Sequence, residues 1–156
     1  MKKQKKIDLN SDEFGRYDTI YTGNYIPNGY LIRKSIFSII EPFTDEAPLE
    51  DWYLMMQISK YSKMKYLDEI LFSYRWHDNN TIKNNSKMGE ASLKTLLYEE
   101  KILEDIDENK VLPEVLDAKK YGACYKKQGI PFVFELLTYR KGQDKIKIIK
   151  LFNLPM

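Results

Sequence analysis

The segment EDWYLMMQISKYS, residues 50–62, constrains the fold of this chain more than any other stretch. Side chains at positions 51, 55 and 58, and again at 54, 58 and 61, share the spacing of one helical face. Such a strongly apolar helix must bury its side chains against the rest of the chain. We therefore predict one helix here, with Met55 and Met56 filling a core.

Two adjacent carboxylates, Glu50 and Asp51, stand at the start of this predicted helix. Acidic side chains in a first turn meet unpaired backbone N–H groups and typically contribute ~0.3–1 kcal/mol, which needs no chemistry. Alternatively, one carboxylate removes a proton from a hydroxyl nucleophile while its neighbour braces the site. The pair alone leaves both interpretations open.

Length and charge exclude several classes of protein. A chain of 156 residues is about one domain long, and its net charge of +2 gives no reason to expect nucleic acid as a partner. The single Cys124 excludes an intramolecular disulfide and fits a reducing compartment. No apolar run approaches a membrane span, and the basic start leads into no signal peptide, so we expect a cytoplasmic protein.

The first half predicts short strands and helices after an irregular start. Residues 1–18 mix charge with turn-forming residues and predict a flexible basic lead-in. Residues 19–40 predict a strand or loop, a strand after the turn at Pro27-Asn28-Gly29, and a short helix from Lys34 to Ile40. Two short extended runs follow over residues 64–76.

The second half, residues 83–156, is helical in pattern. A first amphipathic helix is predicted from the spacing of Leu93, Leu96, Leu97, Leu103 and Ile106. Pro113 opens a second helix to about Lys127, and Pro131 opens a third. The basic KGQDKIKIIKLF near the end predicts either a packed terminal helix or one that lies on an anionic membrane surface. The fold class is therefore α+β, with a helical tail.

Three stretches in order resemble a known family. YIPNGYLIRKSIF, then LEDWYLMMQIS, then KYLDEILFSYRWHDNNT resemble the acceptor-side half of the family-2 nucleotide-sugar glycosyltransferases, which have the GT-A fold. The resemblance covers roughly residues 21–82 and is specific as an ordered set. It implies that residues 19–82 form part of a GT-A-like catalytic domain.

Residue by residue, the resemblance implies a division of roles. Asp51 would be the general base that deprotonates the acceptor hydroxyl for inverting attack on the donor sugar, and Glu50 would brace it or bind acceptor. Trp52 would pack beneath the carboxylates on the acceptor side, where Asn28 and Gly29 would lie at a strand end. A last set would face the donor diphosphate and its cation: Arg75 and His77.

The resemblance also implies partners that these residues do not supply alone. Such enzymes bind a nucleotide-sugar donor and Mn²⁺ or Mg²⁺ through a preceding half with a D-x-D-like motif, which is not found before Tyr21. We therefore expect the carboxy-terminal half of a glycosyltransferase that uses a glycan or lipid-linked acceptor, with no cation of its own. An exposed edge and apolar face would favour a homodimer or pairing with a nucleotide-binding half. The alternative is a non-catalytic interaction or oligomerisation module derived from such an enzyme.

Overall fold

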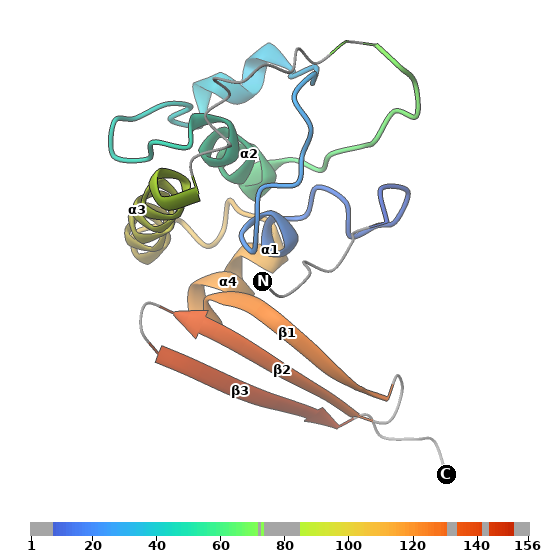
Figure 1. Cartoon of the computed structure of the whole chain (residues 1–156), viewed down its shortest axis with the longest axis vertical. Coiled ribbons are helices and arrows are strands. Elements are labelled where there is room, and N and C mark those ends of the chain that lie inside the picture. Colours follow the sequence, from blue (N-terminus) through green and yellow to red (C-terminus); the bar gives the residue numbers. More distant parts are fainter. Residues whose placement is uncertain (1–7, 72, 74–84, 131–133, 142–143, 152–156) are drawn as a thin grey trace.

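A computed structural model describes residues 8–71, 73, 85–130, 134–141 and 144–151 of this chain. A group of helices forms one part, and a three-stranded antiparallel sheet forms the other (Figure 1). The coarse α+β class is therefore confirmed. The helices come first in the chain and the described strands come last.

Four α-helices and one 3₁₀ helix make up the helical part. The α-helices are α1 (Tyr17–Ile20), α2 (Glu50–Tyr61), α3 (Asn85–Glu104) and α4 (Pro113–Tyr121), and the 3₁₀ helix spans Lys34–Ser38. α2 has the predicted bounds within one residue, and Pro113 opens α4 as predicted, because a proline at the first helical position loses no hydrogen bond. Among the described helices, none is both long and apolar enough to cross a bilayer.

The sheet contains β1 (Ala123–Ile130), β2 (Phe134–Lys141) and β3 (Asp144–Leu151) in the order β1-β2-β3. In its register, Leu137 lies opposite Lys127 of β1 and Ile148 of β3. α4 ends at Gly122, whose φ of 77° suits a residue without a side chain, and the chain passes at once into β1.

The predicted helical tail is therefore wrong beyond α4. β1 begins at Ala123, within the helix expected to reach about Lys127, and β2 occupies the region of the helix expected after Pro131. The basic KGQDKIKIIKLF contains β3, because isoleucines 146 and 148 alternate with lysines 145 and 147, a period of two. Neither a terminal helix nor a membrane-surface helix forms there.

The strands expected in the first half are also absent from residues 8–71 and 73. α1 and irregular segments occupy the region of the expected strand or loop and of the strand after it, whereas the 3₁₀ helix lies within the short helix expected from Lys34 to Ile40. Residue 18 does not separate a loose lead-in from the fold, because Tyr17 is fully buried and begins α1. The last turn of the lead-in therefore joins the core through Tyr17.

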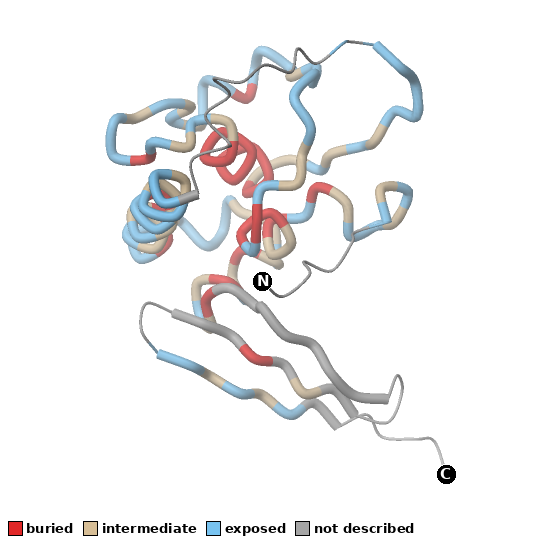
Figure 2. Tube along the Cα trace, in the orientation of Figure 1, coloured by how far each residue is buried: buried red, intermediate tan, exposed pale blue. Residues whose placement is uncertain are grey.

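The core surrounds α2, in which every residue from Trp52 to Lys60 is buried. Figure 2 shows this helix and α1 as the most deeply buried elements of the helical part. The packed apolar residues outside α2 are Tyr17, Ile20, Tyr21, Ile36, Leu103, Val115 and Ala118. A helix that is buried on all sides also carries its polar side chains into the core.

Candidate functional site

The predicted catalytic carboxylates lie in the first turn of α2. Leu49 is the N-cap residue, and Glu50 and Asp51 follow as the first helical residues. One carboxylate oxygen of Asp51 accepts a hydrogen bond from the backbone N–H of Trp52 at 2.7 Å. Glu50 is exposed and Asp51 is partly exposed, so both carboxylates are accessible from solvent.

The bend at Asn28 and Gly29 ends beside this helix start. Both residues are exposed, and Gly29 has a φ of 102°, a conformation that suits glycine. Burial, and then the charges of Asp51 and Glu50, raise the pKa of Tyr30. The structure thus brings this bend towards the carboxylates, but no strand ends there.

Trp52 has a packing role beneath the carboxylates. Its side chain is 4% exposed, and its indole N–H donates to the carbonyl oxygen of Ile20 at 2.7 Å. An aromatic ring enclosed in this way offers no open face to an acceptor sugar. Trp52 instead fixes the first turn of α2 against the end of α1.

The predicted donor-side residues, Arg75 and His77, lie outside the described residues. Within the described ranges, no group of three or more His, Cys, Asp or Glu side chains gathers to hold a metal ion. We therefore assign no cation ligand to this part of the chain.

A buried polar network, which sequence reasoning missed, joins α1, α2 and α3. Glu99 of α3 is fully buried and forms an ion pair with Lys60 of α2 at 2.7 Å. The Tyr17 hydroxyl donates to the Glu99 carboxylate at 2.6 Å, and the Gln57 amide donates to it at 2.7 Å. Lys60 also donates to the Gln57 side-chain carbonyl at 2.8 Å. Each of these four side chains therefore has a hydrogen-bond or ion-pair partner within the network.

Burial determines the electrostatics of this network. It lowers the pKa of Lys60, and the Glu99 charge opposes that effect. It also raises the pKa of Tyr17 far above its usual range, with the Glu99 charge acting in the same direction. Because these groups are closed to solvent, the network cannot act on a substrate and serves to hold the helices together.

A second contact fixes the other end of α2. The Thr95 hydroxyl of α3, fully buried, accepts a hydrogen bond from the backbone N–H of Leu49 at 3.2 Å. Thr95 and Glu99 are one helical turn apart, so the same face of α3 contacts both ends of α2. The helix that carries Asp51 is therefore held at both ends by polar contacts.

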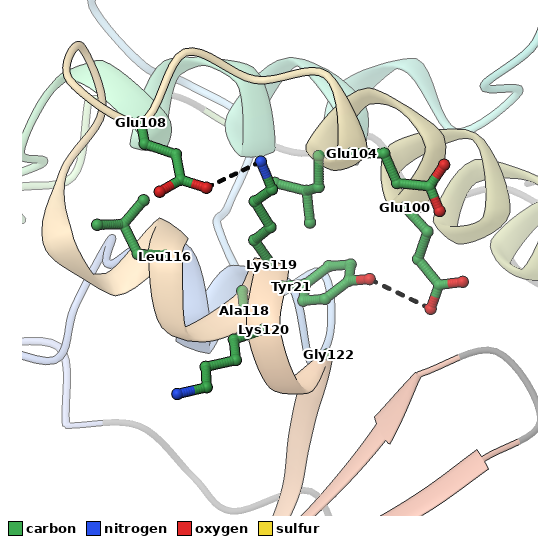
Figure 3. A pocket seen from close by; sticks show the side chains of 10 residues that line it. Tyr21, Glu100, Glu104, Glu108, Leu116, Ala118, Lys119, Lys120 and Gly122 are labelled. Atoms are coloured by element: carbon green, nitrogen blue, oxygen red, sulfur yellow. Dashed lines mark hydrogen bonds and ion pairs between the residues drawn. The ribbon is translucent and has the colours of Figure 1, made fainter.

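A pocket of about 390 Å³ lies between α3 and α4, where Tyr21, Glu100 and Leu116 line it (Figure 3). Glu108 and Lys119 form an ion pair of 3.0 Å at its edge, and the Tyr21 hydroxyl lies 3.4 Å from a carboxylate oxygen of Glu100. None of the predicted site residues that the structure describes lines this pocket. The pocket is therefore separate from the Asp51 surface.

No protein-family model, curated protein or solved structure matches this chain. The resemblance to glycosyltransferases thus stays a prediction that rests on residues 21–82 of the sequence. The geometry of the described residues must carry any argument about function.

Proposed function

We propose that this chain is the acceptor side of an inverting nucleotide-sugar glycosyltransferase in which Asp51 is the general base. The position of the Asp51 carboxylate is the observation that carries the proposal. It is partly exposed in the first turn of a helix whose residues 52–60 are buried and which is held at both ends. A base needs this combination of access and fixed geometry.

The proposed reaction is a single displacement. Asp51 takes the proton of the acceptor hydroxyl while that oxygen forms a bond to the anomeric carbon of the donor sugar. The bond from the anomeric carbon to the nucleoside diphosphate breaks on the opposite side, which inverts the configuration. Glu50, on the same turn and exposed, is suited to bind another acceptor hydroxyl, and the exposed bend at Asn28 and Gly29 directly precedes Tyr30, whose hydroxyl is within reach of the charges of both carboxylates.

Exposed apolar side chains ahead of α2 support pairing with a nucleotide-binding half. Leu31 is 98% exposed, and Ile39 and Phe43 are also exposed in the segment that precedes the carboxylates. Contiguous apolar surface on a soluble protein commonly marks an interaction site. This surface would place a donor-binding part next to the acceptor side of Asp51.

Substitution of Asp51 tests the proposal. The chain is incubated with nucleotide-diphosphate sugars, Mn²⁺ or Mg²⁺, and saccharide or lipid-linked acceptors, alone and with a separately expressed nucleotide-binding half. Release of nucleoside diphosphate is then measured. Asp51→Asn should lower turnover by about 10²–10⁴-fold, because it removes the base. Asp45→Asn, at an exposed position before α2, serves as the matched control and should retain full turnover.

Two results would contradict the assignment. Unchanged turnover in Asp51→Asn would remove Asp51 as the base. Failure of the unsubstituted chain to support transfer even together with a nucleotide-binding half would favour the non-catalytic interaction module instead.

A further inference from the structure

The outer face of α3 carries two leucines among its exposed polar residues. Leu93 is 59% exposed and Leu97 is 51% exposed, whereas Thr95 and Glu99 on the opposite face are fully buried. Figure 2 shows α3 at the margin of the helical part, with exposed residues along its outer side. Leu103 of the same helix is buried in the core, so Leu93 and Leu97 are the part of α3 that departs from the usual pattern of apolar inside and polar outside.

The inner face has a structural reason for its polarity. Thr95 accepts a hydrogen bond from the start of α2, and Glu99 pairs with Lys60 near its end. The outer leucines have no such role within the described residues. Apolar side chains on an exposed helical face typically serve an interface.

Charges on the outer face show which partner fits. Glu90, Leu93, Leu97 and Lys101 follow one another at spacings of three and four residues, so they share one face of the helix. When two copies of α3 run antiparallel, Leu93 of one copy meets Leu97 of the other, and Glu90 meets Lys101 at both ends. A parallel pair would instead set Glu90 against Glu90 and Lys101 against Lys101.

From this self-complementary pattern we infer that the outer face of α3 is a homodimer interface, formed by antiparallel pairing with a second copy of this chain. One further exposed feature extends the fit. Gly89, which has open space where a side chain would lie, lets the facing helix approach closely at the rim.

The interface should be weak but specific. α3 has 20 residues and is therefore about 30 Å long. A single helix pair of that length buries less surface than a standard stable interface of about 1,600 Å². We therefore expect a dissociation constant on the order of 10 µM or weaker, so the dimer forms in a concentration-dependent manner.

Reversing the charges of Glu90 and Lys101, singly and together, tests the antiparallel pairing. Sedimentation velocity over a wide range of protein concentrations should show dimers of the unsubstituted chain. Glu90→Lys alone and Lys101→Glu alone should each weaken the homodimer at least about tenfold, because each places like charges together at both ends. The double variant should restore dimers, and an equimolar mixture of the two single variants should form heterodimers, because every pair is then of opposite sign.

Two further variants separate the interface from a general loss of structure. Leu97→Lys should give a monomer, whereas Leu67→Lys, at an exposed leucine outside α3, should leave the dimer intact. Circular dichroism checks that each variant keeps its helices. A monomer at all concentrations, single charge variants that dimerise normally, or loss of dimers in Leu67→Lys but not in Leu97→Lys would each overturn the inference. The test is independent of whether Asp51 is a catalytic base.

Discussion

Substitution of Lys60 by methionine tests whether the buried network holds the helix that carries Asp51. Methionine matches the apolar stem of lysine in length but lacks the ammonium group. Glu99, fully buried, would keep only the neutral donors Tyr17 and Gln57 at 2.6 and 2.7 Å. Its charge would then have no counter-charge within contact distance in the described structure.

The expected loss is large on the scale of protein stability. Removing one partner from a buried ion pair typically costs ~3–5 kcal/mol, because the remaining charge is desolvated without compensation. A domain of this size has a total stability of about 5–15 kcal/mol. The two retained hydrogen bonds to Glu99 favour the lower part of the range, so we expect the free energy of unfolding to fall by about 3 kcal/mol at pH 7.

Urea unfolding followed by tryptophan fluorescence and circular dichroism measures this loss, since Trp52 is buried beside α1. Lys63→Met, at an exposed lysine just after α2, is the matched control and should change stability by no more than about 0.5 kcal/mol. Adding Glu99→Gln to Lys60→Met removes the unpaired charge and should recover part of the loss. Equal stability of Lys60→Met and Lys63→Met would refute the buried pair.

Two further predictions concern a glycine and alkaline pH. Gly15→Ala should lower the free energy of unfolding by about 1–3 kcal/mol, because the φ of Gly15 is 72° and an added Cβ atom would overlap the Met64 side chain. Gly89→Ala should slightly raise the free energy of unfolding, because Gly89 is helical and an added Cβ atom there meets only open space. Thermal unfolding measures both changes. Burial raises the pKa values of Tyr17 and Tyr21 above their usual range, so the folded state keeps protons that the unfolded state loses. Stability should therefore fall as the pH rises above about 11, where unfolded lysines are largely neutral, by roughly 1 kcal/mol per pH unit for each tyrosine that stays protonated in the folded state alone. A stability that stays flat from pH 10.5 to 12 in urea titrations would contradict the burial of these hydroxyl groups.

The sequence was sufficient to predict the helices that carry a strong local signal. The dense apolar run from Trp52 to Ile58 predicted α2, and Pro113 predicted the start of α4. In each case a strong local signal marks the element. Asp51 could also be placed at the start of α2 from the sequence alone.

The sheet could not be predicted by a search for helical spacing. The lysines and isoleucines of β3 also fit a basic helix with an apolar face, although Ile146 and Ile148 are spaced for a strand. In short segments with several adjacent apolar residues, periods of two and 3.6 are hard to separate. The segment forms a strand because β2 pairs with both β1 and β3, and such pairing depends on contacts between residues that are distant in the sequence.

The buried network was missed for a different reason. Gln57, Lys60 and Glu99 are residue types that normally lie at the surface, and nothing in their own segments marks them as buried. Only the packing of α3 against α2 brings the Glu99 carboxylate to the Lys60 ammonium. Polar residues inside an apolar helix, such as Gln57 and Lys60, were the one available signal, and they gain meaning once α2 is known to be buried on all sides.

The polar contacts of α3 connect the proposed base to the proposed dimer. Its inner face contacts α2 through Thr95 and Glu99, and on this face these two side chains are buried while Leu93 and Leu97 stay outside. Exposed leucines on a helix are covered when a further surface packs on them. Pairing of two copies through α3 would cover those leucines, whereas Glu50 and Asp51 lie on α2. A catalytic surface on α2 and a dimer interface on α3 can therefore coexist in one molecule.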